Sequence, residues 1–96
     1  MAHYVVLGQF TDQGIRGVKD TTKRAKNFRE TAKSMNVTVK DIYWTLGLYD
    51  VIVTIETPDD ETATSFMMKI GSLGNLKSQT LRAFSESEAA SLVAKL

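Results

Sequence analysis

The densest group of polar and aromatic side chains lies between residues 43 and 50, and it contains Tyr43, Trp44, Gly47, Tyr49 and Asp50. Turn chemistry alone explains Gly47 and Asp50, because glycine adopts positive φ and aspartate accepts hydrogen bonds from turn amides. Alternatively, this loop lies at the mouth of a barrel and presents Tyr49 and Asp50 to a small ligand, since barrel mouths are frequent pocket locations. The sequence leaves both interpretations open.

Three residues outside this loop could contribute to the same site. His3 is the only histidine; it is either a surface residue or, if its strand faces a cavity, the best candidate for proton transfer. Arg82 lies in an otherwise uncharged run, so it must be exposed or paired, with Asp50 or Glu56 or with a ligand carboxylate. Thr80 lies in the same run and could line the same cavity.

The sequence argues against metal and cofactor chemistry. It has no cysteine, which excludes disulfides, thiolate metal sites and cysteine nucleophiles. The consecutive acidic residues Asp59, Asp60 and Glu61 suit the start of a helix better than a metal site, because hard-cation sites draw their ligands from several segments. Nucleotide-binding glycine loops and zinc-protease motifs are missing. We therefore expect no metal and no cofactor.

Apolar periodicity and capping signals predict four strands and several helices in a single domain over residues 1–96. Thr57 is expected to cap one helix, with Pro58 at its first position, and Ser85 and Glu88 form a capping-box pattern for the last. Asn36 is a good left-handed stop for the helix before it. The expected order is strand 3–10, a short helix after Thr11-Asp12, a longer helix to Asn36, strands 37–46 and 51–57, a helix from Pro58 to Gly71 or Gly74, strand 76–84 and a final helix.

Each expected helix has one apolar stripe that predicts its buried face. The stripes are Ile15, Val18, Ala25, Phe28, Ala32 and Met35; then Ala63, Phe66, Met67 and Ile70; and finally Ala89, Leu92, Val93 and Leu96.

This order predicts an α+β fold, a ferredoxin-like βαββαβ sandwich plus a C-terminal helix. Strand 3–10 is apolar on both sides, and strand 37–46 places Ile42, Trp44 and Leu46 on one side and Tyr43 on the other. Because the helices can cover only one face of the sheet, something else must cover the second apolar face. The sheet of a second copy of the chain is the simplest candidate. We therefore expect a homodimer, or a multiple of dimers, in which two sheets form a dimeric α+β barrel.

Charge and hydropathy limit the other partners. Eight of the twelve Lys and Arg residues lie between residues 16 and 40, but no aromatic residues alternate with them, so a solvated helix face is favoured over direct nucleic-acid binding. The apolar runs are far shorter than the roughly 20 residues that span a bilayer. No secretory signal is visible, and the expected location is cytoplasmic.

The chain resembles the GYD-domain family, which is named for a Gly-x-Tyr-Asp signature. The matching stretches are Tyr4 to Leu7, Thr11 to Ile15, Tyr43 to Asp50, Glu56 to Glu61 and Thr80 to Phe84. The resemblance covers nearly the whole chain and implies a dimeric α+β barrel, but it implies little about activity.

The loop between the two middle strands is also similar to that of the effector-binding domain of leucine-responsive (AsnC-type) regulators. This similarity implies a ligand site near a subunit interface that includes Gly47, Tyr49 and Asp50, together with Thr80. The DNA-binding helix-turn-helix of those regulators has no counterpart here, so direct DNA binding is not implied.

Three functions remain open. The first is a homo-oligomeric binding or sensor module for a small, amino-acid-like molecule, with Tyr43, Trp44, Gly47, Tyr49, Asp50, Thr80 and Arg82 as its ligand-binding residues. The second is a cofactor-independent monooxygenase or isomerase for a hydrophobic substrate, in which His3 or Asp50 moves a proton and Tyr43 and Trp44 line the cavity. The third is a structural assembly protein.

Overall fold

The computed structural model describes all 96 residues. The secondary structure follows the predicted order, including the short helix before the longer one. The elements are β1 (Ala2–Phe10), α1 (Asp12–Arg16), the 3-10 turn η1 (Val18–Asp20), α2 (Thr21–Ser34), β2 (Thr38–Trp44), β3 (Val51–Thr57), α3 (Asp60–Ser72), β4 (Leu76–Ala83) and α4 (Glu86–Val93).

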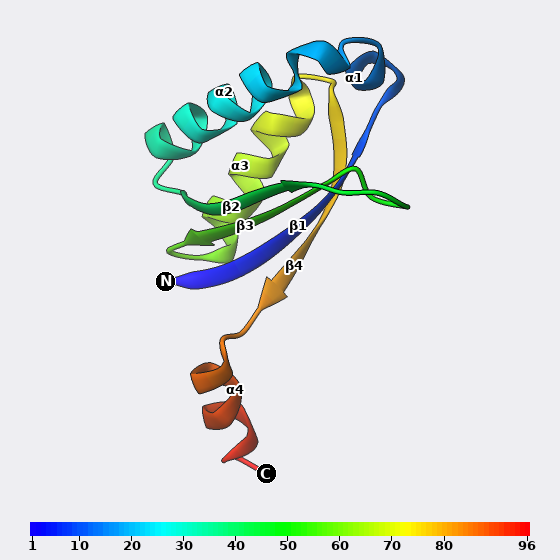
Figure 1. The fold of residues 1–96 in the computed structure, drawn as a ribbon. Coiled ribbons are helices and arrows are strands. Elements are labelled where there is room, and N and C mark those ends of the chain that lie inside the picture. The colour runs from blue at the N-terminus through cyan, green and yellow to red at the C-terminus, as the bar shows by residue number, and fades with distance from the viewer.

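The four strands form one antiparallel sheet in the order β2-β3-β1-β4. Helices α2 and α3 lie side by side on one face of this sheet, and no element covers the other face (Figure 1). The predicted ferredoxin-like α+β fold is therefore confirmed. The two central strands are β3 and β1, so their side chains dominate both faces.

Strand alternation divides the sheet into a face toward the helices and a face away from them. In β3, Val51, Val53, Ile55 and Thr57 are buried toward the helices, and the residues between them are only partly buried. In β1, Tyr4 and Val6 are buried, with 4% and 0% exposure. The sheet thus presents its most closely packed side chains to the helices and a second, less covered surface to the outside.

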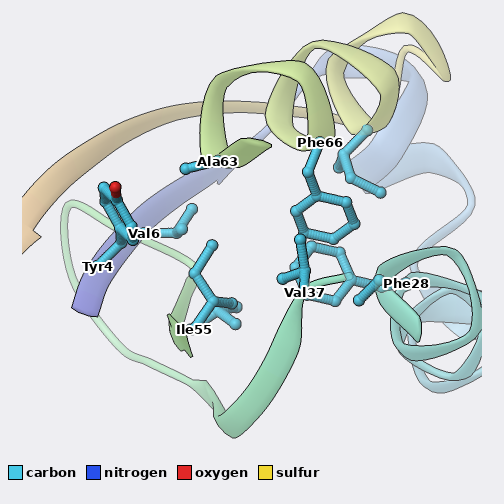
Figure 2. Close-up of a cluster of buried hydrophobic side chains, with 10 residues drawn as sticks. Tyr4, Val6, Phe28, Val37, Ile55, Ala63 and Phe66 are labelled. Atoms are coloured by element: carbon cyan, nitrogen blue, oxygen red, sulfur yellow. The ribbon is translucent and has the colours of Figure 1, made fainter. Parts of the chain in front are cut away.

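The core lies between the sheet and α2 and α3 (Figure 2). Phe66 of α3 is fully buried and meets Phe28 of α2 edge to face, with ring centroids 4.9 Å apart. This is the preferred geometry for an aromatic pair, because the positive edge of one ring approaches the negative face of the other. The two aromatic rings therefore fix the two helices against the same part of the sheet.

The first predicted stripe is only partly correct. Phe28 and Ala32 are buried, and Met35 packs against the core. Ile15 and Val18 are 52% and 38% exposed; they belong to α1 and η1, which are separate elements from α2. Asn36 has φ 61° and stops α2 as expected.

The predicted start of α3 is wrong by two residues. Thr57 is fully buried as the last residue of β3, where it pairs with Ala2, so it is not the helix cap. Asp59 takes that role, and its carboxylate accepts a hydrogen bond of 2.8 Å from the Thr62 backbone N–H. Pairing within the sheet holds Thr57 in β3, and Pro58 lies in the connection between β3 and the Asp59 cap of α3.

The Asp59 cap gives a pH-dependent prediction. The hydrogen bonds from Thr62 hold the pKa of Asp59 below its usual value of 3.8. The stabilisation is therefore fully present above the unfolded-state pKa and is lost as pH falls through the lower folded-state pKa. We expect Asp59→Ala to lower the urea midpoint at pH 7, and we expect the difference from the unmodified protein to shrink below pH 3.8. Asp12→Ala, which removes a first-turn carboxylate of α1, is the control, because its effect should be smaller at pH 7.

The predicted burial of the last helix is wrong. Ser85 and Glu88 form the expected capping box, but α4 has no buried residue. Leu92, Val93 and Leu96 are 43%, 63% and 103% exposed, and Ala89 is only partly buried. The helix projects away from the sheet beyond the end of β4 (Figure 1). Its apolar stripe therefore has no cover within one chain.

None of the helices has the length and apolar character that a bilayer-spanning segment needs.

Candidate functional site

The sheet face away from the helices, called the open face below, has an apolar centre and a polar rim. Val5 of β1 lies beside Leu81 of β4, and Leu7 of β1 lies beside Ile52 of β3. These four side chains are partly or largely accessible, and Leu81 is 45% exposed. A contiguous apolar strip on an otherwise polar surface indicates an interaction site.

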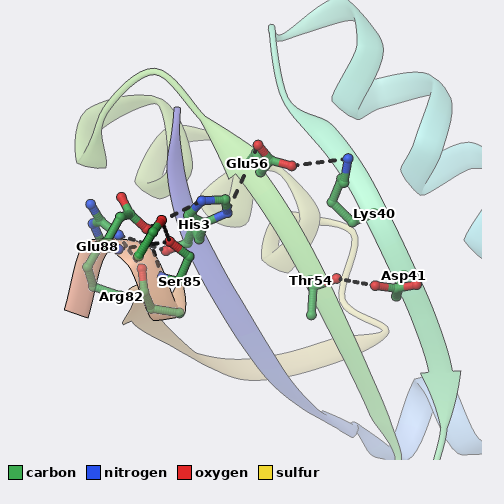
Figure 3. Close-up of polar contacts among 10 residues, drawn as sticks. His3, Lys40, Asp41, Thr54, Glu56, Arg82, Ser85 and Glu88 are labelled. Atoms are coloured by element: carbon green, nitrogen blue, oxygen red, sulfur yellow. Dashed lines mark hydrogen bonds and ion pairs between the residues drawn. The ribbon is translucent and has the colours of Figure 1, made fainter. Parts of the chain in front are cut away.

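One end of the open face carries a chain of ionisable side chains (Figure 3). His3 Nδ1 lies 4.0 Å from Glu56 Oε1, and His3 Nε2 lies 3.4 Å from Glu88 Oε1. Lys40 Nζ continues the chain with a distance of 3.3 Å to Glu56 Oε2. His3 therefore lies on the open face, between two carboxylates. A role in proton transfer would require this face to line a cavity.

Glu88 connects this chain of ionisable side chains to α4. The hydrogen bond from the Ser85 backbone N–H holds the pKa of Glu88 below its usual value, and the charge of His3 acts in the same direction. Glu88 thus serves two contacts: it completes the capping box of α4, and it faces His3 on β1. These contacts fix the root of α4, whereas its apolar end stays free.

The β2–β3 loop reaches over the opposite end of the open face. The Tyr49 hydroxyl donates a hydrogen bond of 3.2 Å to Gln79 Oε1 of β4, on the far side of β3 and β1. Gln9 Nε2 donates to the Leu48 carbonyl at 2.9 Å. Tyr43 lies on the same face, opposite Ile52, and is 60% exposed.

Asp50 and Gly47 have structural roles in this loop. Asp50 Oδ2 accepts a hydrogen bond of 2.8 Å from the Phe10 backbone N–H, and the Asp50 N–H donates to the Gly8 carbonyl at 2.8 Å. Gly47 has φ 123°, a conformation that side chains rarely adopt. The interpretation of Gly47 as a turn residue is supported. The Asp50 carboxylate accepts from β1 rather than from a turn amide, and one of its oxygens is engaged.

Asp50→Ala is expected to destabilise the protein by about 1–2 kcal/mol, because the part-buried Phe10 N–H loses a charged acceptor. Urea unfolding at pH 7 measures this difference. Asp41→Ala is the matched control: Asp41 is exposed and accepts only from the Thr54 hydroxyl, at 3.0 Å. A control as destabilising as Asp50→Ala would contradict the special role of the Phe10 contact.

The remaining predicted residues lie on the other side of the sheet. Trp44 pairs with Val51, faces the helices and donates from Nε1 to the Thr21 hydroxyl at 2.9 Å. Thr80 and Arg82 pair with Val6 and Tyr4, so they too point to the helix side, at the opposite edge of the sheet from Trp44. Within one chain, the predicted ligand residues therefore do not converge on one pocket. The enzyme hypothesis meets the same difficulty, since Trp44 is separated by the sheet from His3 and Tyr43.

The sequence predicts that Arg82 is either exposed or paired. It is exposed, and neither Asp50 nor Glu56 is its partner. Its guanidinium donates to the carbonyls of His3 and Ala83 and lies 4.4 Å from the centroid of the Phe84 ring. The predicted ion pair fails because Glu56 lies on the open face and is engaged by Lys40. Arg82 instead fixes the end of β4 where α4 begins.

Sequence reasoning missed Lys40, Glu56, Gln79 and Glu88 as members of the open face. A signal was present in β3, where Ile52, Thr54 and Glu56 alternate with buried residues. This alternation places a carboxylate on the face that His3 shares. Lys40 could not have been placed in this way, because a bulge between Val39 and Asp41 breaks the alternation of β2.

Comparisons with known proteins agree with this fold. The GYD domain family matches residues 4–93. The chain is 31% identical over 97 residues to a Thermus thermophilus protein named "Glutamine synthetase and cystathionine beta-lyase binding protein", and the match covers 100% of this chain and 99% of that protein.

Among solved structures, the fold is similar to the crystal structure of MtbAldR (Rv2779c), with a TM-score of 0.69 at 14% identity. The similarity covers 88% of this chain and 52% of that one, so the chain spans about half the length of that protein. Family match, end-to-end relative and fold agree, and the chain belongs to the GYD-domain family.

Proposed function

We propose that this protein is a self-associating binding protein whose partner is an enzyme of amino-acid metabolism, with glutamine synthetase as the first candidate. The observation that carries this proposal is the end-to-end relative that is named for binding glutamine synthetase and cystathionine beta-lyase. A relative that matches the whole chain has no additional domain to which that binding could be assigned. A location in the cytoplasm, where such enzymes act, forms part of the proposal.

The exposed area supports self-association. One chain exposes 6412 Å², whereas a compact monomer of this mass exposes about 5,500 Å². The excess of about 900 Å² is close to the roughly 800 Å² that each partner buries in a standard interface. A second copy is the occupant that we propose for the open face, because two copies of its apolar strip can pack around a two-fold axis.

Helix α4 supports the same proposal. Leu92 and Val93 are exposed on a helix that projects beyond the sheet, and Phe84 at its root is 49% exposed. Only the capping-box end of α4 contacts the body of the chain, through Glu88 and His3. In a dimer, an arm of this kind can reach the partner subunit, which would cover the stripe that one chain leaves open.

Small-molecule sensing at the interface between copies is the second candidate. The observation that favours it is the reach of Tyr49 across the open face to Gln79. In the dimer, Tyr43, Gly47 and Tyr49 would line the rim of the interface, while Trp44, Thr80 and Arg82 would lie outside this site unless another subunit brought them close. Native mass spectrometry of the purified protein would reveal a bound small molecule as additional mass.

The main proposal is tested with the purified chain and glutamine synthetase of the same source. The chain is immobilised and the enzyme is passed over it, with an unrelated multisubunit enzyme of similar size and charge as the control. We expect saturable binding of glutamine synthetase alone. Equal retention of both enzymes, or of neither, would overturn the assignment of this partner.

A further inference from the structure

A cavity of about 280 Å³ lies between α2, the end of α3 and the helix side of the sheet. It is separate from the open face, and no function considered above uses it. Ten of its fourteen lining residues are hydrophobic, including Phe28, Ile42, Trp44 and Ile70. Its volume is close to the lower end of the range of small-molecule pockets, about 300–1,000 Å³.

The only charged residue that lines this cavity is Arg24 of α2. Its guanidinium lies 5.8 Å from the centroid of the Phe10 ring, and Nη2 donates to the Gly14 carbonyl at 3.0 Å. None of the ion pairs in the chain includes Arg24. A guanidinium has five N–H donors, so most of its capacity to bind a carboxylate is unused.

The other polar groups of the cavity also offer donors. Thr21 Oγ1 accepts from the Trp44 indole N–H at 2.9 Å, which leaves the Thr21 hydroxyl hydrogen free to donate. Asn75 Oδ1 accepts from Gln13 at 2.9 Å, so its NH₂ group is also available. No aspartate or glutamate lines the cavity. An apolar chamber bordered by a cation and neutral donors is complementary to an anion with an apolar body.

We propose that this cavity binds a small monocarboxylate with an apolar body, such as a medium-chain fatty acid or an arylalkanoate. The carboxylate pairs with Arg24, and the apolar body lies between Trp44 and Phe28. The proposal is independent of the self-association proposed for the open face, because the cavity lies on the other side of the sheet.

Trp44 provides a direct readout, since it is the only tryptophan of the chain and lines the cavity. The probe is octanoate, with octan-1-ol and octylammonium as its neutral and cationic analogues. We expect octanoate to shift the Trp44 fluorescence and the single indole N–H resonance in a saturable manner. We expect affinity at least tenfold weaker for octanol, and none for octylammonium. Equal affinity for octanoate and octanol, or no response to octanoate, would overturn the proposal.

Two variants and a control locate the site. Arg24→Gln should weaken octanoate binding about tenfold or more and leave octanol binding unchanged. Ala25→Leu, which fills the cavity from α2, should remove binding of both probes. Lys23 is adjacent to Arg24 in the sequence but does not line the cavity. Lys23→Gln should therefore change the affinities for octanoate and octanol by no more than twofold. Equal losses in Lys23→Gln and Arg24→Gln would show general attraction to a basic helix and would reject the site. This comparison stands even if Ala25→Leu does not fold.

Discussion

Gly14→Ala is expected to destabilise the fold by about 3 kcal/mol, because the added methyl group has no space. A Cβ atom at Gly14 would lie 2.0 Å from the backbone carbonyl oxygen of Asn75. That oxygen cannot move freely, since it accepts the Thr11 N–H at 3.2 Å, and the Thr11 hydroxyl holds the neighbouring Gly74 carbonyl at 2.6 Å. The substitution must therefore separate α1 from the loop that leads into β4.

Gly71→Ala is the matched control for this effect. Gly71 lies within α3, and a Cβ atom there would meet nothing within 4 Å. Alanine is the better helix former, so we expect this substitution to stabilise the protein by about 0.5–1 kcal/mol. Urea unfolding of both variants at pH 7 measures the contrast. Two alanine substitutions with effects of the same sign would show that the contact between Gly14 and Asn75 is not the cause.

The order of strands and helices could be predicted because each element carries a local signal. Alternation in residues 51–57 marks a strand whose partners lie on both sides, and Ser85 with Glu88 marks a helix start through contacts three residues apart. Burial is different, because it depends on what covers an element. The apolar stripe of α4 has the correct spacing for a buried face, but nothing in one chain lies against Leu92 and Val93.

The candidate site was harder to predict because it depends on register and on the face of each strand. Tyr43 and Trp44 are neighbours in the sequence and lie on opposite sides of the sheet, as alternation requires. Asp50 attracted a ligand-binding interpretation, and the sequence gives no sign that one of its carboxylate oxygens accepts from a backbone N–H of β1, 40 residues away. Contacts between segments so far apart in the sequence leave no local pattern to read.

Leu7→Lys is expected to raise the dissociation constant of the proposed dimer about a hundredfold or more. Leu7 lies on the central strand β1, within the apolar strip of the open face, beside Ile52. In a two-fold dimer each subunit contributes one lysine, so the interface would have to bury two unpaired charges. The long apolar stem of lysine can lie along the open face of a single chain while its ammonium reaches water, so the monomer should remain folded.

Met68→Lys is the control for this experiment, because Met68 is 71% exposed on α3, on the helix side of the molecule. Sedimentation or native mass spectrometry over a range of concentrations measures both variants, with circular dichroism as the check on folding. If Met68→Lys dissociates the protein and Leu7→Lys does not, the helices rather than the open face form the interface. If Leu7→Lys alone dissociates the protein, the open face forms the interface. The same monomeric variant can then be tested for binding to glutamine synthetase. Loss of binding would show that the enzyme site needs the dimer, and retained binding would show that a single chain carries it.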